Sequence, residues 1–310
     1  MKLGFRFIYY DKSDERVIYM SNKNSKLWYA LFTMPLFLIF LTVVVIPFLI
    51  GIYYSFIEWN GIPSNPKVFV GLDNYATLFQ DQRFLDSAWQ TIKFTVFALI
   101  SVNLLGLIFS LIVTAGFRTS NLARTLLFMP NLIGGLILGY IWRFIFTDGF
   151  KQIGATTGID SIFFNWLLDP NYALLALVIV FTWQMAGYTM VIYIAGIQGI
   201  SEEVMEAAKV DGANLWHRIT KIVFPLLMPS FTICLFLTLS GAFKIYDVNL
   251  SLTNGGPIHT TELFAMNIFN EIFGYGNYGL GQAKAIIFFV IVALVTLTQV
   301  VITKRKEVQM

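Results

Sequence analysis

The stretch EEVMEAAKVDGANLWHRITKIVFPLLMP, residues 202–229, places seven charged side chains in a chain that is otherwise strongly apolar. Uncharged runs flank its charged part, at 170–201 and 222–243. Each run reaches the roughly 18 to 20 residues that a helix needs to cross a bilayer core of about 30 Å. We therefore expect the charged part to connect two membrane-spanning helices.

The composition extends this interpretation to the whole chain. Of its 310 residues, 57% are hydrophobic and 13% are charged, whereas soluble domains carry about 25% charged residues. Four more uncharged runs occur, at 27–57, 94–117, 125–142 and 285–303. Backbone polar groups in lipid must be paired within the span, and the long runs lack the alternation of barrel strands. The predicted fold class is therefore an all-α polytopic membrane protein with six transmembrane helices, at 28–57, 89–116, 125–146, 171–198, 222–247 and 281–303.

The distribution of Lys and Arg predicts the orientation. With a cytoplasmic N-terminus, three of these residues lie outside, namely Lys67, Arg83 and Lys151. Fourteen lie inside: Lys2, Arg6, Lys12, Arg16, Lys23, Lys26, Arg118, Arg124, Lys209, Arg218, Lys221, Lys304, Arg305 and Lys306. The positive-inside rule then puts both termini and the charged stretch in the cytoplasm. The net charge of +3 follows from this bias and gives little support to nucleic-acid binding.

The domain organisation follows from the spans. We expect a cytoplasmic N-terminal segment at 1–27, a transmembrane domain at 28–303 and a cytoplasmic tail at 304–310. The predicted external connections are 58–88, 147–170 and 248–280. Gly and Pro inside the spans, such as Pro130 with Gly134 and Gly135, indicate a bundle that bends or slides. Cys234 is the single cysteine, so an intrachain disulfide is impossible.

The charged stretch is predicted to form two short helices joined by a sharp turn. Ser201 can cap the first helix, and Gly212 can end it because glycine readily adopts a positive φ. Asn214 can cap the second helix. Helical spacing puts Val204, Ala207, Ala208 and Asp211 on one face, where the small alanines would let another protein approach closely.

These residues resemble a known signature. Glu206-Ala207-Ala208, then Gly212, and later Ile222 with Phe224-Pro225, are similar to the EAA loop of the permease subunits of ABC importers. Phe224 stands where that family more often has Leu, and Ser201 where it often has Pro. The resemblance implies that the loop 199–222 couples the permease to an ATPase subunit. The implied coupling residues are Glu206, Ala207, Ala208, Asp211 and Gly212.

The resemblance covers nearly the whole chain after the N-terminal segment. FVGLDNYATLFQD (69–81), FMPNLIGGLILGYIWRFIF (128–146), YIAGIQGISEEVMEAAKVDGA (193–213) and LTNGGPIHTTE (252–262) are similar to permeases for carbohydrate uptake, including the maltose type. This implies the type I ABC importer permease fold in the cytoplasmic membrane. It also implies three kinds of partner: a second, related permease in a heterodimer, two cytoplasmic ATP-binding subunits and an extracytoplasmic solute-binding protein.

The chain itself has no nucleotide-binding loop. The pattern G-x-x-x-x-G-K-[ST], which cradles ATP phosphates, does not occur in it. We therefore expect this subunit to be non-catalytic and to hold no cofactor, with ATP and Mg²⁺ bound by the ATPase subunits.

Polar residues in and beside two spans are the predicted solute contacts, because burying them in lipid is costly. They are Gln184 and Tyr188 in the fourth span, and Thr238, Lys244, Tyr246 and Asp247 in or beside the fifth. Structural alternatives stay open, namely helix–helix hydrogen bonding for Gln184, interfacial anchoring for the tyrosines and an ion pair of Lys244 with Asp247. Further candidates, more in keeping with structural roles, are Asn103, Asn131 and Arg143.

Other function classes are less well supported. An ion-coupled secondary transporter would need intramembrane carboxylates and inverted repeats, and a membrane enzyme would need a clustered catalytic set. His217 and His259 are too isolated to predict a metal site. Glu262 and Glu271 suit contacts with the binding protein or loop structure. Glycerol phosphate or another polyol is the alternative cargo to a sugar.

Overall fold

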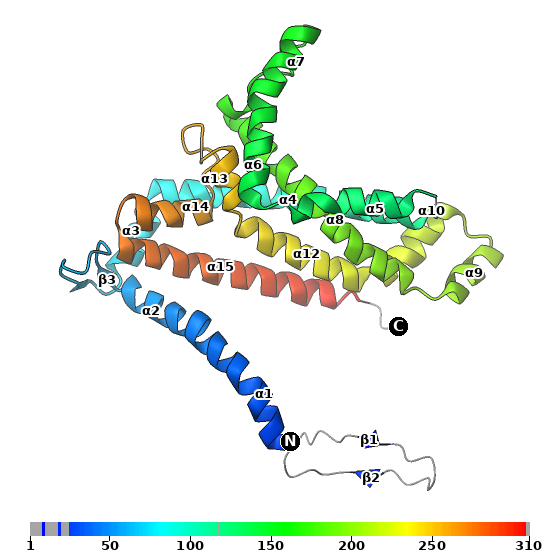
Figure 1. The fold of residues 1–310 in the computed structure, drawn as a ribbon, viewed down its shortest axis with the longest axis horizontal. Coiled ribbons are helices and arrows are strands. Elements are labelled where there is room, and N and C mark those ends of the chain that lie inside the picture. Colours follow the sequence, from blue (N-terminus) through cyan, green and yellow to red (C-terminus); the bar gives the residue numbers. More distant parts are fainter. Residues whose placement is uncertain (1–7, 10–17, 20–24, 117, 308–310) are drawn as a thin grey trace. The chain divides into compact units, whose positions relative to one another are not determined.

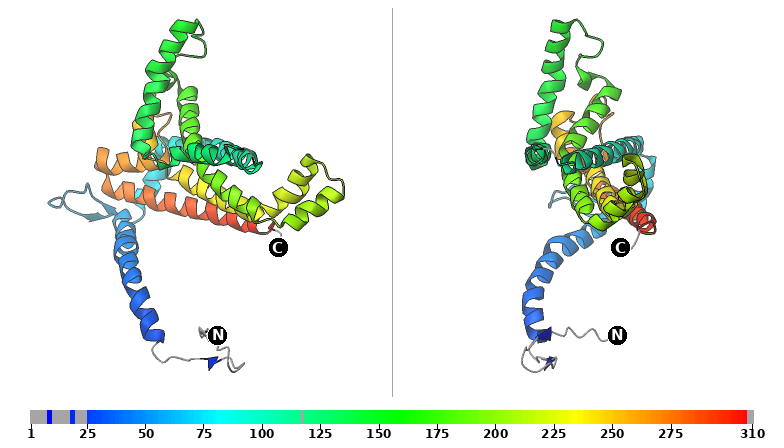
Figure 2. Two further views of the ribbon diagram at one scale, coloured as in Figure 1. Left: turned by 45° about the vertical axis from the view of Figure 1, so that its right-hand side comes forward. Right: turned by 90° about the vertical axis from the view of Figure 1, so that its right-hand side faces the viewer.

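The computed structural model describes residues 8–9, 18–19, 25–116 and 118–307. The chain forms two compact units, residues 1–53 and 54–310, shown as ribbons in Figures 1 and 2. Most of the predicted N-terminal segment 1–27 lies outside the described residues, as do residues 308–310 of the predicted tail.

The first unit contains a strand pair and an apolar helix. Strands β1 (Ile8–Tyr9) and β2 (Ile18–Tyr19) pair antiparallel. The helix consists of α1 (Ser25–Phe40), the π-helical turn η1 (Leu41–Val45) and the start of α2 (Ile46–Ser55). Of its most apolar 18 residues only 6% are buried among the described residues, as expected for a helix that crosses a membrane.

The second unit begins with a β-hairpin and a short helix, which lead into the next span. The hairpin of β3 (Ile57–Glu58) and β4 (Val68–Phe69) precedes α3 (Asp73–Gln80) and α4 (Gln82–Thr114). The Asp81 carboxylate accepts hydrogen bonds from the backbone N–H groups of Arg83 at 3.0 Å and Phe84 at 3.3 Å. This cap explains why α4 begins before residue 89, where the sequence places the start of the span.

The third span is broken, which corrects the continuous helix expected at 125–146. Its first part is α5 (Ser120–Phe128) with the 3₁₀ turn η2 (Met129–Leu132). Its second part is bent by 100° from the first and comprises α6 (Gly135–Phe144), η3 (Ile145–Gly149) and α7 (Phe150–Thr157). Pro130 lacks an N–H donor, and Ile133 and Gly134 adopt extended backbone, so the helix stops there.

The fifth predicted span, 222–247, is also corrected. The helical segment Leu215–Leu226 is bent by 68° from the next helix, α12 (Met228–Phe243), with Leu227 between them. Pro225 and Pro229 flank this break, and each removes a helical N–H donor. Four described helices can each span a bilayer, and six spans result when each bent pair counts as one.

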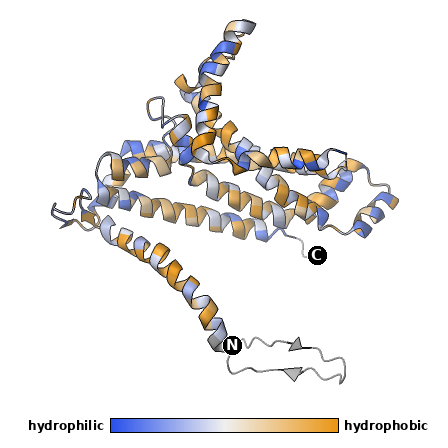
Figure 3. Cartoon of the chain, viewed as in Figure 1, coloured by the Kyte–Doolittle hydropathy of each residue, from blue (hydrophilic) through white to orange (hydrophobic). Residues whose placement is uncertain are grey.

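The remaining elements arrange the bundle around α8 (Pro170–Gln198), which packs against α4, α5 and α12. Of its most apolar 18 residues 56% are buried, against 6% for the last helix, α15 (Tyr278–Lys304). Hydrophobic residues predominate along α15 (Figure 3). Outside the charged stretch, the remaining short elements are η4 (Trp166–Leu168), α13 (Asp247–Leu252), α14 (Phe264–Phe269) and η6 (Asn270–Gly274).

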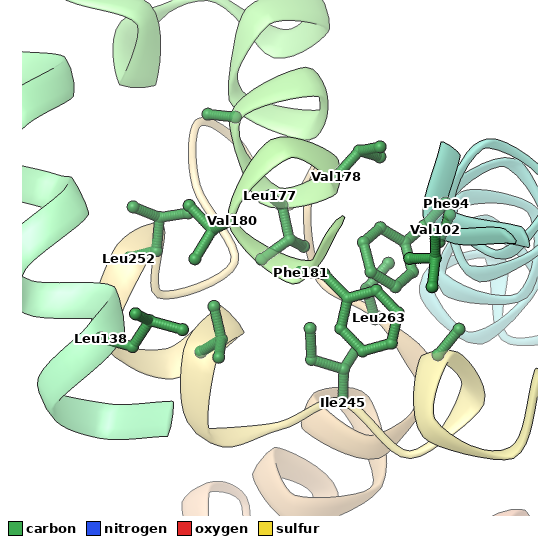
Figure 4. Close-up of a cluster of buried hydrophobic side chains, with 14 of the residues drawn as sticks. Phe94, Val102, Leu138, Leu177, Val178, Val180, Phe181, Ile245, Leu252 and Leu263 are labelled. Carbon is green, nitrogen blue, oxygen red and sulfur yellow. The ribbon is translucent and has the colours of Figure 1, made fainter. Parts of the chain in front are cut away.

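A core of apolar side chains joins the bent second part of the third span to the bundle. Leu138 of α6, Leu177 of α8 and Leu252 of α13 are fully buried within it. Figure 4 shows these side chains together with Phe181 and Ile245. The core therefore gathers segments that lie far apart in the sequence.

Glycine allows the closest helix–helix approaches. A Cβ at Gly106 of α4 would lie 2.2 Å from Oγ1 of Thr189 in α8. A Cβ at Gly187 of α8 would lie 1.9 Å from the carbonyl oxygen of Leu127 in α5. Both distances are shorter than any van der Waals contact, so close packing requires glycine here.

Candidate functional site: a helical hairpin and a polar break in the bundle

The charged stretch folds into a hairpin of two helices at one end of the bundle (Figure 1). Its first helix is α9 (Glu202–Val210). Gly212 has φ +77°, and its N–H donates to the carbonyl of Lys209 at 3.1 Å. The N–H of Ala213 donates to the carbonyl of Ala208 at 2.9 Å. This pair of bonds is a Schellman motif, and it confirms the predicted turn at Gly212.

The second helix of the hairpin begins at its predicted cap. Asn214 Oδ1 accepts a hydrogen bond from the backbone N–H of His217 at 2.8 Å. Helix α10 (Leu215–Arg218) continues through the π-helical turn η5 (Ile219–Val223) into α11 (Phe224–Leu226). Ser201, in contrast, makes no side-chain cap bond to α9. The prediction for Ser201 is therefore wrong, although its backbone conformation still starts the helix.

The hairpin presents exposed apolar side chains. Val210 is 87% exposed and Trp216 is 72% exposed. Of the predicted coupling residues, Glu206, Ala207, Asp211 and Gly212 are exposed and Ala208 is buried. Val204, Ala207 and Asp211 therefore form the open part of the predicted face, whereas Ala208 is covered and cannot contact another protein as predicted.

A groove of about 510 Å³ lies between the end of α8 and α9. Its lining includes Gln198, Glu202, Glu206 and Lys209. No ion pair joins Glu206 to Lys209 among the described residues. The Glu206 carboxylate is thus available to a group from another molecule. Beneath the groove, the buried cluster of Ile200, Val223 and Leu227 connects the hairpin to the spans.

The predicted solute residues of the fourth span lie beside the break in the third. Gln184 Nε2 donates a hydrogen bond at 3.2 Å to the carbonyl of Ile133, a group that the end of the helix leaves free. Tyr188, one helical turn further along, is half-buried. Asn131 Nδ2 contacts Met185 Sδ at 3.8 Å. The break is thus a polar point inside the apolar part of the bundle.

Residues between α12 and α13 reach the same break. A Cβ at Gly135 would lie 2.9 Å from Cβ of Asp247, so the start of α6 lies directly on Asp247. Lys244 and Asp247 are exposed, and no ion pair joins them in the described part of the chain. Tyr246 packs on Phe269 with ring centroids 5.0 Å apart. Partial burial and the neighbouring Asp247 carboxylate raise the pKa of Tyr246, so its hydroxyl stays neutral.

Thr238 has a different environment. It is fully buried and accepts a hydrogen bond at 3.4 Å from Nδ2 of Asn103. The Tyr193 hydroxyl donates to Oδ1 of Asn103 at 2.9 Å. This network connects α4, α8 and α12, and in this conformation it leaves Thr238 out of reach of a solute. Arg143, on α6, is exposed.

An ionic network at the other end of the bundle was not anticipated from the sequence. The Lys284 ammonium is fully buried and lies 2.6 Å from Oδ2 of Asp81 and 2.5 Å from Oε2 of Glu271. Glu262 pairs with Arg83. The sequence left two roles open for Glu262 and Glu271, contacts with the binding protein or loop structure. These ion pairs favour the structural role. The available signal was Lys284 next to an uncharged run, since a buried cation requires a partner.

The histidines do not form a metal site. His217 is exposed, and Nδ1 of His259 lies 3.0 Å from Glu262. Among the described residues, no group of three or more His, Cys, Asp or Glu side chains could hold a metal ion.

By fold, the second unit is a multi-span helical bundle that carries a helical hairpin at one end. The chain belongs to the family of binding-protein-dependent transport system inner membrane components, whose sequence profile matches residues 103–308. The prediction of this family from the EAA signature is confirmed.

Individual relatives match most of the chain. It is 48% identical over 284 residues to the probable starch degradation products transport system permease protein AmyD of Thermoanaerobacterium thermosulfurigenes, covering 92% of this chain and 96% of that protein. It is 32% identical to the sn-glycerol-3-phosphate transport system permease protein UgpA of Agrobacterium fabrum, covering 77% of this chain and 81% of that protein.

A solved structure shares the fold. It is a chain of the bacterial alginate ABC transporter in complex with alginate pentasaccharide-bound periplasmic protein, with a TM-score of 0.79. The match covers 91% of this chain and 96% of that one at 21% sequence identity. The predicted type I importer permease fold is therefore confirmed.

Proposed function

We propose that this protein is the permease subunit of an ATP-driven importer that passes a sugar or oligosaccharide across the cytoplasmic membrane. An extracytoplasmic binding protein delivers the solute, and two separate ATPase subunits supply the energy. A second, related permease completes the passage. The hairpin end of the bundle is cytoplasmic in this proposal, in agreement with the distribution of Lys and Arg.

The observation that carries the proposal is the hairpin of α9 and α10. Its turn is fixed by the Schellman motif at Gly212, and it exposes Val210 and Trp216 to solvent. Exposed apolar side chains on a rigid element indicate a protein interface. The cluster around Val223 and Leu227 connects this element to the spans. A pull on the hairpin would therefore be transmitted to α8 and α12.

The charges near the break in the third span support a neutral cargo. The connection after α12 exposes one cation, Lys244, and one anion, Asp247. A phosphate-bearing solute would require an excess of positive charge, whereas a sugar requires hydrogen-bond donors and acceptors near aromatic rings. Gln184, Tyr188 and Tyr246 supply both kinds of group.

Glycerol phosphate is the second candidate, because a glycerol-3-phosphate permease is among the relatives. The two cargoes can be separated by ATP hydrolysis. The complex is reconstituted in lipid with its binding protein and supplied with malto-oligosaccharide or with glycerol-3-phosphate. We expect stimulation by the oligosaccharide, and stimulation by glycerol-3-phosphate alone would reverse the assignment.

Purification of the tagged chain from its native membrane tests the assembly. We expect an ATPase subunit and a second six-span permease to co-purify with it. As a matched test of the interface, Glu206→Lys should weaken recovery of the ATPase, while Lys151→Glu, on the predicted external side, should leave it unchanged. Equal recovery of the ATPase with both variants would contradict the coupling role of Glu206.

A further inference from the structure

The loop between α13 and α14 carries an unusual residue at its tip. Ile258 is 90% exposed and has φ +47°. A branched side chain at positive φ is sterically strained, and such residues persist only where the surrounding structure holds them. The neighbouring His259 also has a positive φ, of +60°. The loop therefore holds an isoleucine in solvent at an energetic cost.

Hydrogen bonds within the loop hold this conformation. The Thr261 hydroxyl lies 2.6 Å from the carbonyl oxygen of Gly256 and 2.8 Å from Oγ1 of Thr253. The N–H of Thr260 donates to the carbonyl of Pro257 at 3.0 Å, and the N–H of Glu262 donates to that of His259 at 3.1 Å. The backbone on both sides of Ile258 is thus tied down.

A buried carboxylate fixes the loop to the bundle. The Glu262 side chain is 1% exposed. It accepts two hydrogen bonds from Arg83, at 2.6 Å from Nε and 2.7 Å from Nη2. Asn270 Nδ2 donates to it at 2.9 Å, and Nδ1 of His259 lies 3.0 Å from it. A bidentate arginine pair of this kind sets both position and orientation. The loop is consequently a preformed element.

We propose that Ile258 is an apolar anchor that inserts into a pocket of the extracytoplasmic solute-binding protein. This inference rests on the proposed function. The loop lies at the end of the bundle away from the α9–α10 hairpin (Figure 1), and so on the external side if the hairpin is cytoplasmic. An anchor on a preformed loop binds without the cost of ordering the loop. Lipid is the poorer occupant, because Ile258 stands alone between Gly256-Pro257 and His259-Thr260 and is not part of an apolar run.

Replacement by glycine separates the anchor from the loop. Ile258→Gly removes the side chain and also relieves the positive-φ strain. We expect unchanged or higher thermal stability. The concentration of solute-loaded binding protein that gives half-maximal ATPase stimulation should rise about ten- to a hundredfold, as expected for loss of one buried isoleucine side chain. Ile258→Val keeps a branched apolar side chain and should stay close to the parent protein.

The control is Leu168→Ala, which shortens another exposed apolar side chain (74% exposed) in a different predicted external connection. It should leave the half-maximal concentration unchanged. If Ile258→Gly also leaves it unchanged, the anchor is refuted while the proposed function stands. If the binding protein fails to stimulate even the parent complex, the proposed function fails instead.

Cross-linking identifies the occupant directly. Cys234, the single natural cysteine, is buried, so Ile258→Cys offers one accessible thiol for a photoreactive probe. The expected product joins this chain to the binding protein. A product with the second permease or with lipid would overturn the proposal.

Discussion

The turn at Gly212 can be tested by a substitution whose cost is confined to the backbone. A Cβ added at Gly212 would meet no described atom within 4 Å, so Gly212→Ala introduces no clash. Its cost comes from φ +77°, a region in which an L-residue loses about 1–2 kcal/mol. Such a loss shifts the equilibrium between the folded hairpin and a hairpin without its turn by a factor of about 5 to 30.

Gly116 provides a matched control. It has φ +83°, and a Cβ there also meets no described atom within 4 Å. It lies between α4 and α5, at the predicted cytoplasmic end of the second span. Gly116→Ala should therefore carry the same backbone cost without altering the hairpin.

The assay is the apparent affinity of purified ATPase subunits for the permease in lipid, together with solute-stimulated ATP hydrolysis. For Gly212→Ala we expect affinity to fall by up to about thirtyfold, and for Gly116→Ala we expect no change. Gly212→Asn should lie between glycine and alanine, because asparagine tolerates a positive φ better than alanine does. Equal affinities for the parent protein and these three variants would refute a docking role for the turn at Gly212.

Three further predictions concern the bundle. Lys284→Met should lower the free energy of unfolding in detergent by about 3–5 kcal/mol, because two carboxylates lose their buried cation. Adding Glu271→Gln should restore part of this free energy. No recovery would contradict the pairing of Lys284 with Glu271. Gly106→Ala should cost about 1–3 kcal/mol through its clash with Thr189, whereas Gly241→Ala, whose Cβ would lie 3.5 Å from Phe181, should be nearly neutral; similar losses would count against the close approach. Burial raises the pKa of Asp81, but the Lys284 ammonium and the backbone N–H groups of Phe84 and Arg83 outweigh it and hold the pKa below its ordinary 3.8. The stabilising contribution of the Asp81 carboxylate should therefore be complete above pH 3.8 and disappear as the pH falls through the lower folded pKa. On acidification, the melting temperature of Asp81→Asn should fall less than that of the parent protein. The same fall in both proteins would contradict this role of Asp81.

Much of the candidate site follows from local sequence. The turn at Gly212 and the cap at Asn214 depend on hydrogen bonds within a few residues, so residue type and spacing predict them. Pro130, Gly134 and Gly135 indicated a bundle that bends or slides, but not where a span would break. The angle of 100° could not be predicted, because it depends on the distant groups that pack at the break, such as Gln184 and Asp247.

The solute residues show the same division. Sequence spacing puts Gln184 and Tyr188 on one face of α8, and the structure places that face at the break. Sequence spacing does not reveal that Thr238 is buried and hydrogen-bonded to Asn103 of a different helix. Burial of a polar group is decided by its neighbours in space, so helical periodicity alone cannot separate a solute contact from a helix–helix bond.

By itself, the sequence determined that the chain is a helical membrane protein, which way its charges favour it to insert, and where its charged hairpin turns. These properties depend on the length of apolar runs and on short-range backbone geometry. Tertiary structure alone decided that Arg83 would hold Glu262 and that Lys284 would hold Asp81, pairs separated by 179 and 203 residues. A buried ion pair forms only where folding brings both partners together and excludes water, and no pattern within one segment encodes that meeting.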